Sequence, residues 1–424
     1  MSGSYDEPTS RATDTPRATD ELVAPGNSRT GRLRSPKRRW GRIIAGLTGA
    51  LLVVFLLTPT GCYLSRAGWE EAKILAGRRQ IVRLVADPST APATRARLQL
   101  VLAARGFAAD SIKLRTGDSF TTYSHLERDT LVLVVSGAYR DRLEPYTWWF
   151  PIVGRVPYKG FFDFDDAKSL ARDLERRGYD SYVRPSAAFS TLGWFNDPLL
   201  STTLRLDSIN LANTVIHKVT HNTFYKAGQA VFNESFANFV GARGAAWFFR
   251  TRGDSALAAF ADADWEDDKR MGTFWASLYR SLDSAYKAHP GDSALATRLA
   301  VRDTVYARGR AHLVNDVAPK LRTIAPERMA RVRIDNNAAL LARRIYLTDL
   351  ELFDRVWARE NYDLKKTIER VIELAKDADD PYAAVKKWLG ETEFGSPGFP
   401  GRGRSPKEAG SLRGRVRQVR ELSG

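Results

Sequence analysis

Two histidines, His217 and His221, are four residues apart, and Glu234 follows them in the chain. On an α-helix, residues at i and i+4 project from one face, one turn apart, so both imidazoles can reach a single metal ion. A Glu on a following helix would complete three protein ligands and leave one position for water, which is the donor set of a catalytic zinc site. The sequence therefore predicts a Zn²⁺ site formed by His217, His221 and Glu234.

Lys218 stands where such a site needs its general base. In the H-E-x-x-H motif, the Glu after the first histidine takes a proton from the zinc-bound water. A protonated lysine cannot accept that proton, and its charge opposes metal binding. A lysine deprotonated by burial and by the metal could instead act as a base or occupy the open coordination position. We expect the first outcome, a loss of about 10² to 10⁴-fold in rate.

The pair of histidines also has a purely structural interpretation, as one exposed and one buried residue of an amphipathic helix. Five histidines in 424 residues make a chance H-x-x-x-H pair weak evidence on its own. The surroundings favour the metal site, because the apolar stretch 208–225 encloses the histidines and phenylalanines flank Glu234. Buried imidazoles and carboxylates need partners. The other histidines, His125, His289 and His312, are expected on the surface or in loops.

The sequence predicts an α+β fold with a helical majority. A small β portion precedes the metal helix, the helix that carries His217 and His221. The β-branched run 130–138 predicts a buried strand, the aromatic segment 150–164 a hairpin, and residues 179–184 a short strand. Helices are expected at residues 63–86, 90–105 (ended by Gly106), 165–177, 208–225, around Glu234 to about residue 250, and at 254–288, 292–324, 337–360 and 363–376.

The net charge of +16 comes largely from the chain ends. Residues 1–42 contain nine Arg and Lys against five Asp and Glu, and residues 395–424 contain seven against two. Both segments are rich in polar residues, Gly and Pro, and we expect them to be disordered. The mildly basic middle carries no aromatic-and-basic nucleic-acid motif, so we expect no nucleic-acid partner.

The segment 43–62 predicts export and membrane tethering. Seven positive charges lie between Arg29 and Arg42, and an uncharged apolar run follows and ends at Gly61 and Cys62. This order is typical of an export signal. Cys62, the only cysteine, would be lipidated in a bacterial lipoprotein signal, and the alternative is an uncleaved signal anchor. In both cases the body of the protein is expected in the cell envelope, outside the cytoplasm.

Several unusual strings together resemble one known family, the bacterial aminopeptidases of the gluzincin type, often lipoproteins. The resemblance covers about residues 62–388. The strings that carry it are Gly61–Leu64, Trp149–Gly154, Tyr158–Asp163, Ser190–Leu200, the helix with His217 and His221, and Asn233–Ala237. By this resemblance His217, His221 and Glu234 match the zinc ligands, and the family's catalytic Glu falls on Lys218.

The resemblance implies a mainly helical, zincin-like metallopeptidase domain over residues 63–390, between the tails 1–42 and 391–424. It would hydrolyse N-terminal residues of peptides; the alternative is an inactive relative that binds peptides or a partner. Tyr346 is a candidate oxyanion donor, with packing on a helix as its other explanation. Residues 190–195 are expected to line the cleft or belong to the core. Asn233 and Ser235 are expected to orient the site rather than bind metal.

Overall fold

The computed structural model describes Trp40, Ile43 and residues 46–50, 54–150, 154–186 and 198–391. It divides the chain into two compact units, Met1–Cys62 and Tyr63–Gly424. The chain is 65% helical with a few small sheets, which confirms a mainly helical α+β fold. Among the described helices, none is by itself long and apolar enough to cross a membrane. Gly46–Leu56 and Thr60–Ala76 pass that test of length and composition only as a bent pair.

All described strands precede the metal helix in the chain, as expected. They are β1 (Arg79–Gln80), β2 (Thr122–Ser124), β3 (Val132–Tyr139), β4 (Pro145–Tyr146), β5 (Trp148–Phe150), β6 (Gly154–Val156), β7 (Tyr158–Phe161), β8 (Tyr179–Ser186) and β9 (Leu199–Leu200). The helices are α2 (Pro59–Ala76), α3 (Ile81–Ala86), α4 (Pro92–Asp110), α5 (Phe164–Arg176), α6 (Ser201–Leu204), α7 (Ser208–Thr223), α8 (Ala230–Thr251), α9 (Ser255–Lys287), α10 (Leu295–His312), α11 (Pro326–Ala330), α12 (Asn337–Arg344), α13 (Leu350–Arg359), α14 (Leu364–Ala375) and α15 (Pro381–Leu389). Single turns of 3₁₀ or π helix occupy Asp292–Ala294, Leu313–Val317 and Ala318–Lys320.

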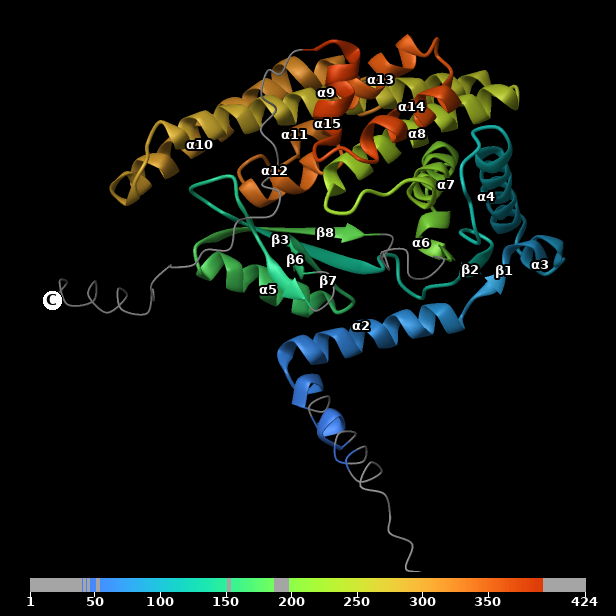
Figure 1. Cartoon of the computed structure of the whole chain (residues 1–424), viewed down its shortest axis with the longest axis horizontal. Coiled ribbons are helices and arrows are strands. Elements are labelled where there is room, and N and C mark those ends of the chain that lie inside the picture. The colour runs from blue at the N-terminus through green and yellow to red at the C-terminus, as the bar shows by residue number, and fades with distance from the viewer. Residues whose placement is uncertain are drawn as a thin grey trace, which may run out of the picture. The chain divides into compact units, whose positions relative to one another are not determined.

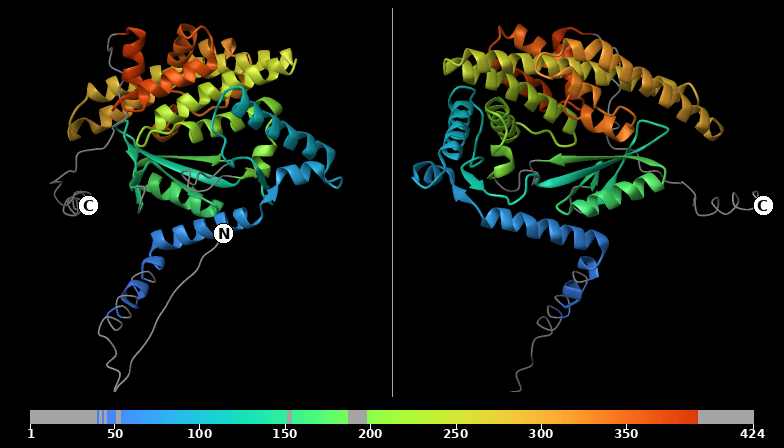
Figure 2. Two further views of the ribbon diagram at one scale, coloured as in Figure 1. Left: turned by 45° about the vertical axis from the view of Figure 1, so that its right-hand side comes forward. Right: turned by 180° about the vertical axis from the view of Figure 1, so that it is seen from behind.

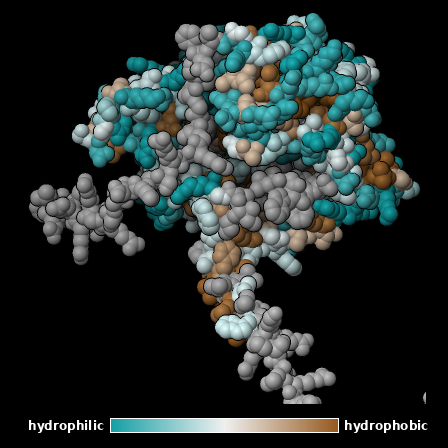
Figure 3. All heavy atoms as spheres, viewed as in Figure 1, coloured by the Kyte–Doolittle hydropathy of each residue, from teal (hydrophilic) through white to brown (hydrophobic). Residues whose placement is uncertain are grey.

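Strand β3 is the centre of the largest sheet. It pairs antiparallel with β8 along its whole length, and on its other side with β7 and β4. Helix α5 packs against one face of this sheet and α12 against the other. The sheet thus lies between α5 and the layer of long helices, as the views of Figures 1 and 2 both show. The visible face of the helical layer is largely hydrophilic (Figure 3).

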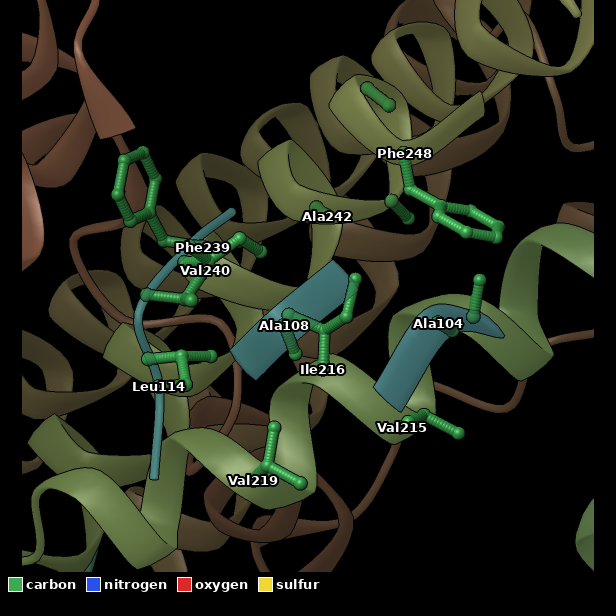
Figure 4. Packing of buried hydrophobic residues seen from close by; sticks show 14 of the residues in the cluster. Ala104, Ala108, Leu114, Val215, Ile216, Val219, Phe239, Val240, Ala242 and Phe248 are labelled. Carbon is green, nitrogen blue, oxygen red and sulfur yellow. The ribbon is translucent and has the colours of Figure 1, made fainter. Parts of the chain in front are cut away.

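Helices α7 and α8 form the centre of the main hydrophobic core. Val215, Ile216 and Val219 of α7 pack with Val240 and Phe248 of α8, all 2% exposed or less (Figure 4). These positions of α7 repeat at i, i+1 and i+4, the spacing of one helix face. Asp207 caps α7, since its side chain accepts from the backbone N–H groups of Ile209 and Asn210. The opposite, half-buried face of α7 is left for the site.

Helix α12 is attached to the sheet and to α9 and α10 through the buried Asn337. The amide oxygen of Asn337 accepts from the hydroxyls of Tyr306 (2.6 Å) and Tyr286 (3.2 Å). Its side-chain nitrogen donates to the carbonyl of Tyr139 on β3 (2.8 Å), and its backbone N–H donates to Asp180 on β8 (2.6 Å). Since buried polar groups fully satisfied in this way fix one arrangement, Asn337 sets where α12 and the turn after it lie on the sheet.

A charged cluster joins α8, α9 and α13. The Arg243 guanidinium donates twice to the Asp354 carboxylate (2.9 and 3.0 Å), and the Trp265 indole N–H donates to the same group (2.9 Å). Lys269 also pairs with Asp354 (2.7 Å), and with the exposed Glu351 (2.9 Å). Arg243 and Asp354 are only 10% exposed, so this pair is far less screened than the surface pairs.

A second polar cluster lies on α9. Asp267 is fully buried and accepts from the backbone N–H groups of Arg322 and Thr323, both at 2.7 Å. Burial, together with the negative charges of Asp264 and Asp267, raises the pKa of Asp268 to about 7. The carboxyl of Asp268 therefore opposes folding once it ionises.

Four helix predictions were wrong in their bounds. The helix expected at 63–86 is broken after Ala76, because Arg79 and Gln80 pair with β2 instead. The helix expected to end at Gly106 continues to Asp110, because Ala104 and Ala108 keep a buried face on both sides of that glycine.

The helix expected at 337–360 is two helices, α12 and α13. The chain turns between them, where Asp349 takes a left-handed conformation (φ 48°). The helix expected at 292–324 is a regular α-helix only from Leu295 to His312. A π-helical turn and a 3₁₀ turn follow it.

Candidate metal centre

The structure brings His217, His221 and Glu234 together. The Nε2 atom of His217 lies 3.3 Å from Glu234 Oε2, and that of His221 lies 3.6 Å from Glu234 Oε1. The two Nε2 atoms are 3.2 Å apart. Ligands placed tetrahedrally at zinc distances of 2.0–2.2 Å would be about 3.4 Å apart. The two nitrogens and the two carboxylate oxygens are thus close to this spacing, and one donor atom from each residue lies within 4.8 Å of the others. Their role as ligands stays a prediction.

Close packing of α7 and α8 aligns these candidate ligands. Gly241, two turns after Glu234 on α8, lies against α7. A Cβ built on Gly241 would lie 3.1 Å from the Asn213 carbonyl oxygen and 3.1 Å from His217 Cβ. Only glycine leaves this space at the crossing. The lack of a side chain at Gly241 thus determines how near His217 comes to Glu234.

The electrostatics of the three groups suit a divalent cation. Burial lowers the pKa of His217, further than the charge of Glu234 raises it. Burial on its own would raise the pKa of Glu234, but hydrogen bonds from His217 and His221 outweigh it and hold that pKa well below its usual range. Neutral imidazoles and an ionised carboxylate are the forms that bind metal. In the described part of the chain, the buried Nδ1 of His221 has no hydrogen-bond partner, so the polar contacts of that ring are those of its Nε2 atom.

Lys218 lies on the same half-buried side of α7 as the histidines. It makes no ion pair or hydrogen bond with another described residue. Its positive charge contributes to the lowered pKa of His217. The residue at the predicted general-base position therefore acts on His217 through its charge and has no described counter-ion.

Tyr346 follows α12 and reaches the site. The Asn238 side chain on α8 donates to its backbone carbonyl (2.7 Å). Burial and the charge of Glu234 raise the pKa of the Tyr346 hydroxyl, so it remains protonated and able to donate. This location agrees with the predicted oxyanion donor, but it does not test that role.

Three further residues border the site that sequence reasoning missed. Tyr158 and Tyr225 are 43% and 56% exposed. Partial desolvation and the charge of Glu234 raise the pKa of both hydroxyls, and Tyr346 raises that of Tyr158 further. The Arg184 guanidinium lies over the Tyr346 ring at 5.8 Å. Tyr225 could have been found from the sequence, since it stands four residues after His221. The other two come from strands, and no local pattern marks them.

The sheet register explains how Tyr158 and Arg184 reach a site built on helices. Tyr158 on β7 and Tyr182 on β8 both pair with Ser136 of β3, so they share one face. Arg184 is two residues from Tyr182 and points to that face as well. Tyr182 packs in the cluster of α9 and α12, which identifies the face as the one turned toward the helices.

Asn233 and Ser235 support the site without joining it. The Asn233 side chain accepts from the Lys226 backbone N–H (3.0 Å) and donates to the Lys226 carbonyl (2.8 Å), which fixes the turn between α7 and α8. The Ser235 hydroxyl accepts from the backbone N–H of Thr348, just after Tyr346 (3.3 Å). This placement agrees with the orienting role expected of both.

The other sequence predictions lie elsewhere. Residues 190–195 are outside the described residues. Cys62 is a free, exposed thiol, and its lipidation stays a prediction. His125 and His312 are exposed and His289 lies in a loop, as expected.

Comparison with known proteins adds the family. The model of a family described as "Putative aminopeptidase" matches residues 62–385, about three quarters of the chain. No curated protein and no solved structure matches. The match covers well over half of the chain, including α7 and α8, so the chain belongs to this aminopeptidase family.

Proposed function

We propose that this chain is a zinc-dependent aminopeptidase of the gluzincin type whose hydrolysis is impaired by Lys218. The observation that carries the proposal is the spacing of three donor atoms, all within 4.8 Å of one another, from two histidines and a carboxylate. Zinc bound there would polarise a peptide carbonyl and acidify its water. The resemblance in sequence and the order of strands before metal helix support a zincin-like domain over residues 63–390.

The residues of the site have separate roles in this proposal. His217, His221 and Glu234 would hold the metal. The hydroxyl of Tyr346 would donate to the oxyanion that forms at the carbonyl. The proton acceptor is missing, because Lys218 occupies its position with a positive charge. Hydrolysis would therefore rely on polarisation and binding alone.

A second candidate function is binding without turnover. Lys218 is the observation that favours it, because the substitution removes the base and leaves all three ligands in place. In that case the protein would hold peptides or a partner. In both cases we propose an exported, membrane-tethered location in the cell envelope, through lipid on Cys62 or through an anchor at residues 43–62. We propose peptides as partners and no nucleic acid.

Metal analysis and one substitution test the proposal. The full chain, purified in detergent, should bind one zinc, and His217→Ala should bind none. Lys218→Glu should raise zinc affinity and raise hydrolysis of aminoacyl anilides by about 10²-fold or more. His217→Ala combined with Lys218→Glu should abolish that gain. Ordinary peptidase rates in the unaltered chain would show that our account of Lys218 is wrong. Zinc binding by Lys218→Glu with no gain on any peptide would leave the binding function.

A further inference from the structure

The unit that begins at Tyr63 has two exposed tryptophans among its described residues, Trp69 and Trp149. They are 64% and 63% exposed, whereas the other described tryptophans of this unit are buried or half-buried. An indole combines a large apolar ring with one polar N–H group, which suits an interface with one apolar and one wet side. Single exposed apolar residues are common on proteins, so the position of these two side chains matters.

Both tryptophans are close to Tyr63. Trp69 is six residues further along α2, about 9 Å along the helix axis. Trp149 is next to Phe150 in β5, and the centre of the Phe150 ring lies 5.8 Å from that of the Tyr63 ring. The Tyr63 hydroxyl donates to the Gly160 carbonyl (2.7 Å), which holds this part of α2 on β7. Trp69 and Trp149 thus belong to one region of the molecule, the surroundings of Tyr63.

Cations accompany both tryptophans. The Lys73 ammonium lies 5.7 Å from the centre of the Trp69 ring, and it also pairs with Glu70 (2.8 Å). Arg155 is exposed and stands opposite Trp149 in the pairing of β5 with β6. It forms no ion pair with a carboxylate in the part of the chain that the structure describes. Indoles next to lysine and arginine are typical of the headgroup level of a membrane, and anionic lipids attract the cations.

The chain brings this region close to the proposed membrane tether. Cys62, the proposed site of lipid attachment, directly precedes Tyr63 and stands seven residues before Trp69, and the alternative anchor ends at the same cysteine. Seven residues span at most about 25 Å even when fully extended. A lipid on Cys62 would therefore keep Trp69 within that distance of the bilayer, whatever conformation the connecting residues take. From Tyr63 on, α2 lies at the end of this body away from the long helices α9 and α10 in every view of Figures 1 and 2.

We propose that the surface around Tyr63, with Trp69 and Trp149, lies in the headgroup layer of an anionic phospholipid bilayer. The inference rests on the proposed membrane tether and adds the orientation of the domain to it. A tether alone leaves the domain free to rotate on the membrane, whereas two indoles and the cations beside them hold one side against the lipid. The layer of long helices is then turned away from the membrane.

Quenching of tryptophan fluorescence by lipid tests the proposal. The full chain, purified in detergent, is transferred to vesicles of phosphatidylcholine and phosphatidylglycerol, with a large excess of lipid so that copies of the chain seldom meet. The phosphatidylcholine is either unlabelled or brominated on its acyl chains next to the headgroups. Trp69→Phe and Trp149→Phe should each lose part of the emission that brominated lipid quenches in the unaltered chain, because each substitution removes an indole in contact with lipid.

Two controls accompany these variants. Tyr362 follows α13 in the helical layer and is 67% exposed, so Tyr362→Trp should add emission that brominated lipid does not quench. Vesicles of phosphatidylcholine alone are the control for charge. There the quenching of Trp69 and Trp149 should be weaker, because Lys73 and Arg155 have no anionic lipid to attract them.

Flotation of the same vesicles in high salt tests the tether separately. If the chain floats and both phenylalanine variants keep all of the quenchable emission, the tether stands and this inference is overturned. If the chain leaves the vesicles in high salt but both indoles are quenched on them in low salt, the tether is overturned and the surface stands. A chain that neither floats nor is quenched overturns both. Quenching of the indole in Tyr362→Trp, or of only one of the two tryptophans, would refute a single oriented surface, and equal quenching without phosphatidylglycerol would refute the preference for anionic lipid.

Discussion

Replacing Gly241 by alanine tests whether the crossing of α7 and α8 sets the metal geometry. The new Cβ would lie 3.1 Å from the Asn213 carbonyl oxygen and 3.1 Å from His217 Cβ, and it would also press on the Asn213 side chain. The side chain can rotate, but the carbonyl and the Cβ move only with the helix. The helices must therefore separate by a few tenths of an ångström at this point.

That shift exceeds what a zinc site tolerates. Ligand distances must hold to about 0.2 Å, so we expect zinc affinity to fall by about 10-fold or more. Overpacking of this kind also lowers the free energy of unfolding by about 1–3 kcal/mol. Competition with a chromophoric chelator measures the first quantity, and urea unfolding of the metal-free protein measures the second.

Gly244→Ala is the matched control on the same face of α8. Its Cβ would meet side-chain methyl groups, Ile112 Cδ1 and Ile216 Cγ2, both at 3.0 Å. We expect a similar loss of stability, about 1–3 kcal/mol, but little change in zinc affinity, because the strain is absorbed by side chains that do not carry a ligand. Equal zinc affinities for the two variants would refute the assignment of the ligand geometry to Gly241.

Three further predictions concern stability. Asp354→Ala should lower the free energy of unfolding in urea by about 1–3 kcal/mol, because it removes the buried carboxylate that Arg243 and Lys269 share and leaves the Trp265 indole N–H without its acceptor. Glu351→Ala, which removes the exposed partner of Lys269, should change it by at most about 1 kcal/mol. Asp268→Asn should stabilise the protein by on the order of 2 kcal/mol at pH 8 and have almost no effect at pH 3, below the ordinary pKa of an aspartate. The folded-state pKa of Asp268, about 7, lies above its ordinary value, so the wild-type side chain destabilises the fold increasingly as pH rises through that window. Equal effects at the two pH values would contradict this. Zinc at 100 times its Kd should stabilise the protein by about 2.7 kcal/mol, and a chelator should remove the gain in thermal unfolding; His221→Ala should show no gain.

The sequence predicted those parts of the site that one helix or one local pattern determines. His217 and His221 share a face because of their spacing, and Glu234 stood out as a charge among phenylalanines. Tyr158 and Arg184 could not be found in this way, since their position depends on the register of β7 and β8 against β3. That register depends on pairing across the fold and not on neighbours in the chain.

The errors in the helices have the same origin. The segment after Ala76 has no unusual helix-breaking sequence beyond Gly77, and it leaves the helix because Arg79 and Gln80 find partners on β2. The turn that separates α12 from α13 passes through Asp349 in a conformation that sequence rarely signals. Tyr346 lies in this turn, so the position of a candidate functional residue depended on the break that the helical pattern concealed.

The geometry of the three candidate ligands also bears on why a cation fits there. Each histidine directs Nε2 toward Glu234, which favours a proton on both of those atoms. Yet the two Nε2 atoms are 3.2 Å apart, and two N–H groups facing each other at that distance repel. If Nε2 of His221 instead carries no proton, its Nδ1 must carry one, and that buried atom has no described acceptor. A metal removes the first conflict, because both Nε2 lone pairs and the carboxylate then share one positive partner. A metal leaves the second conflict in place, because each ring ligated through Nε2 carries its proton on Nδ1. Residue 218 then acts both on how tightly a metal binds and on the chemistry at the bound metal.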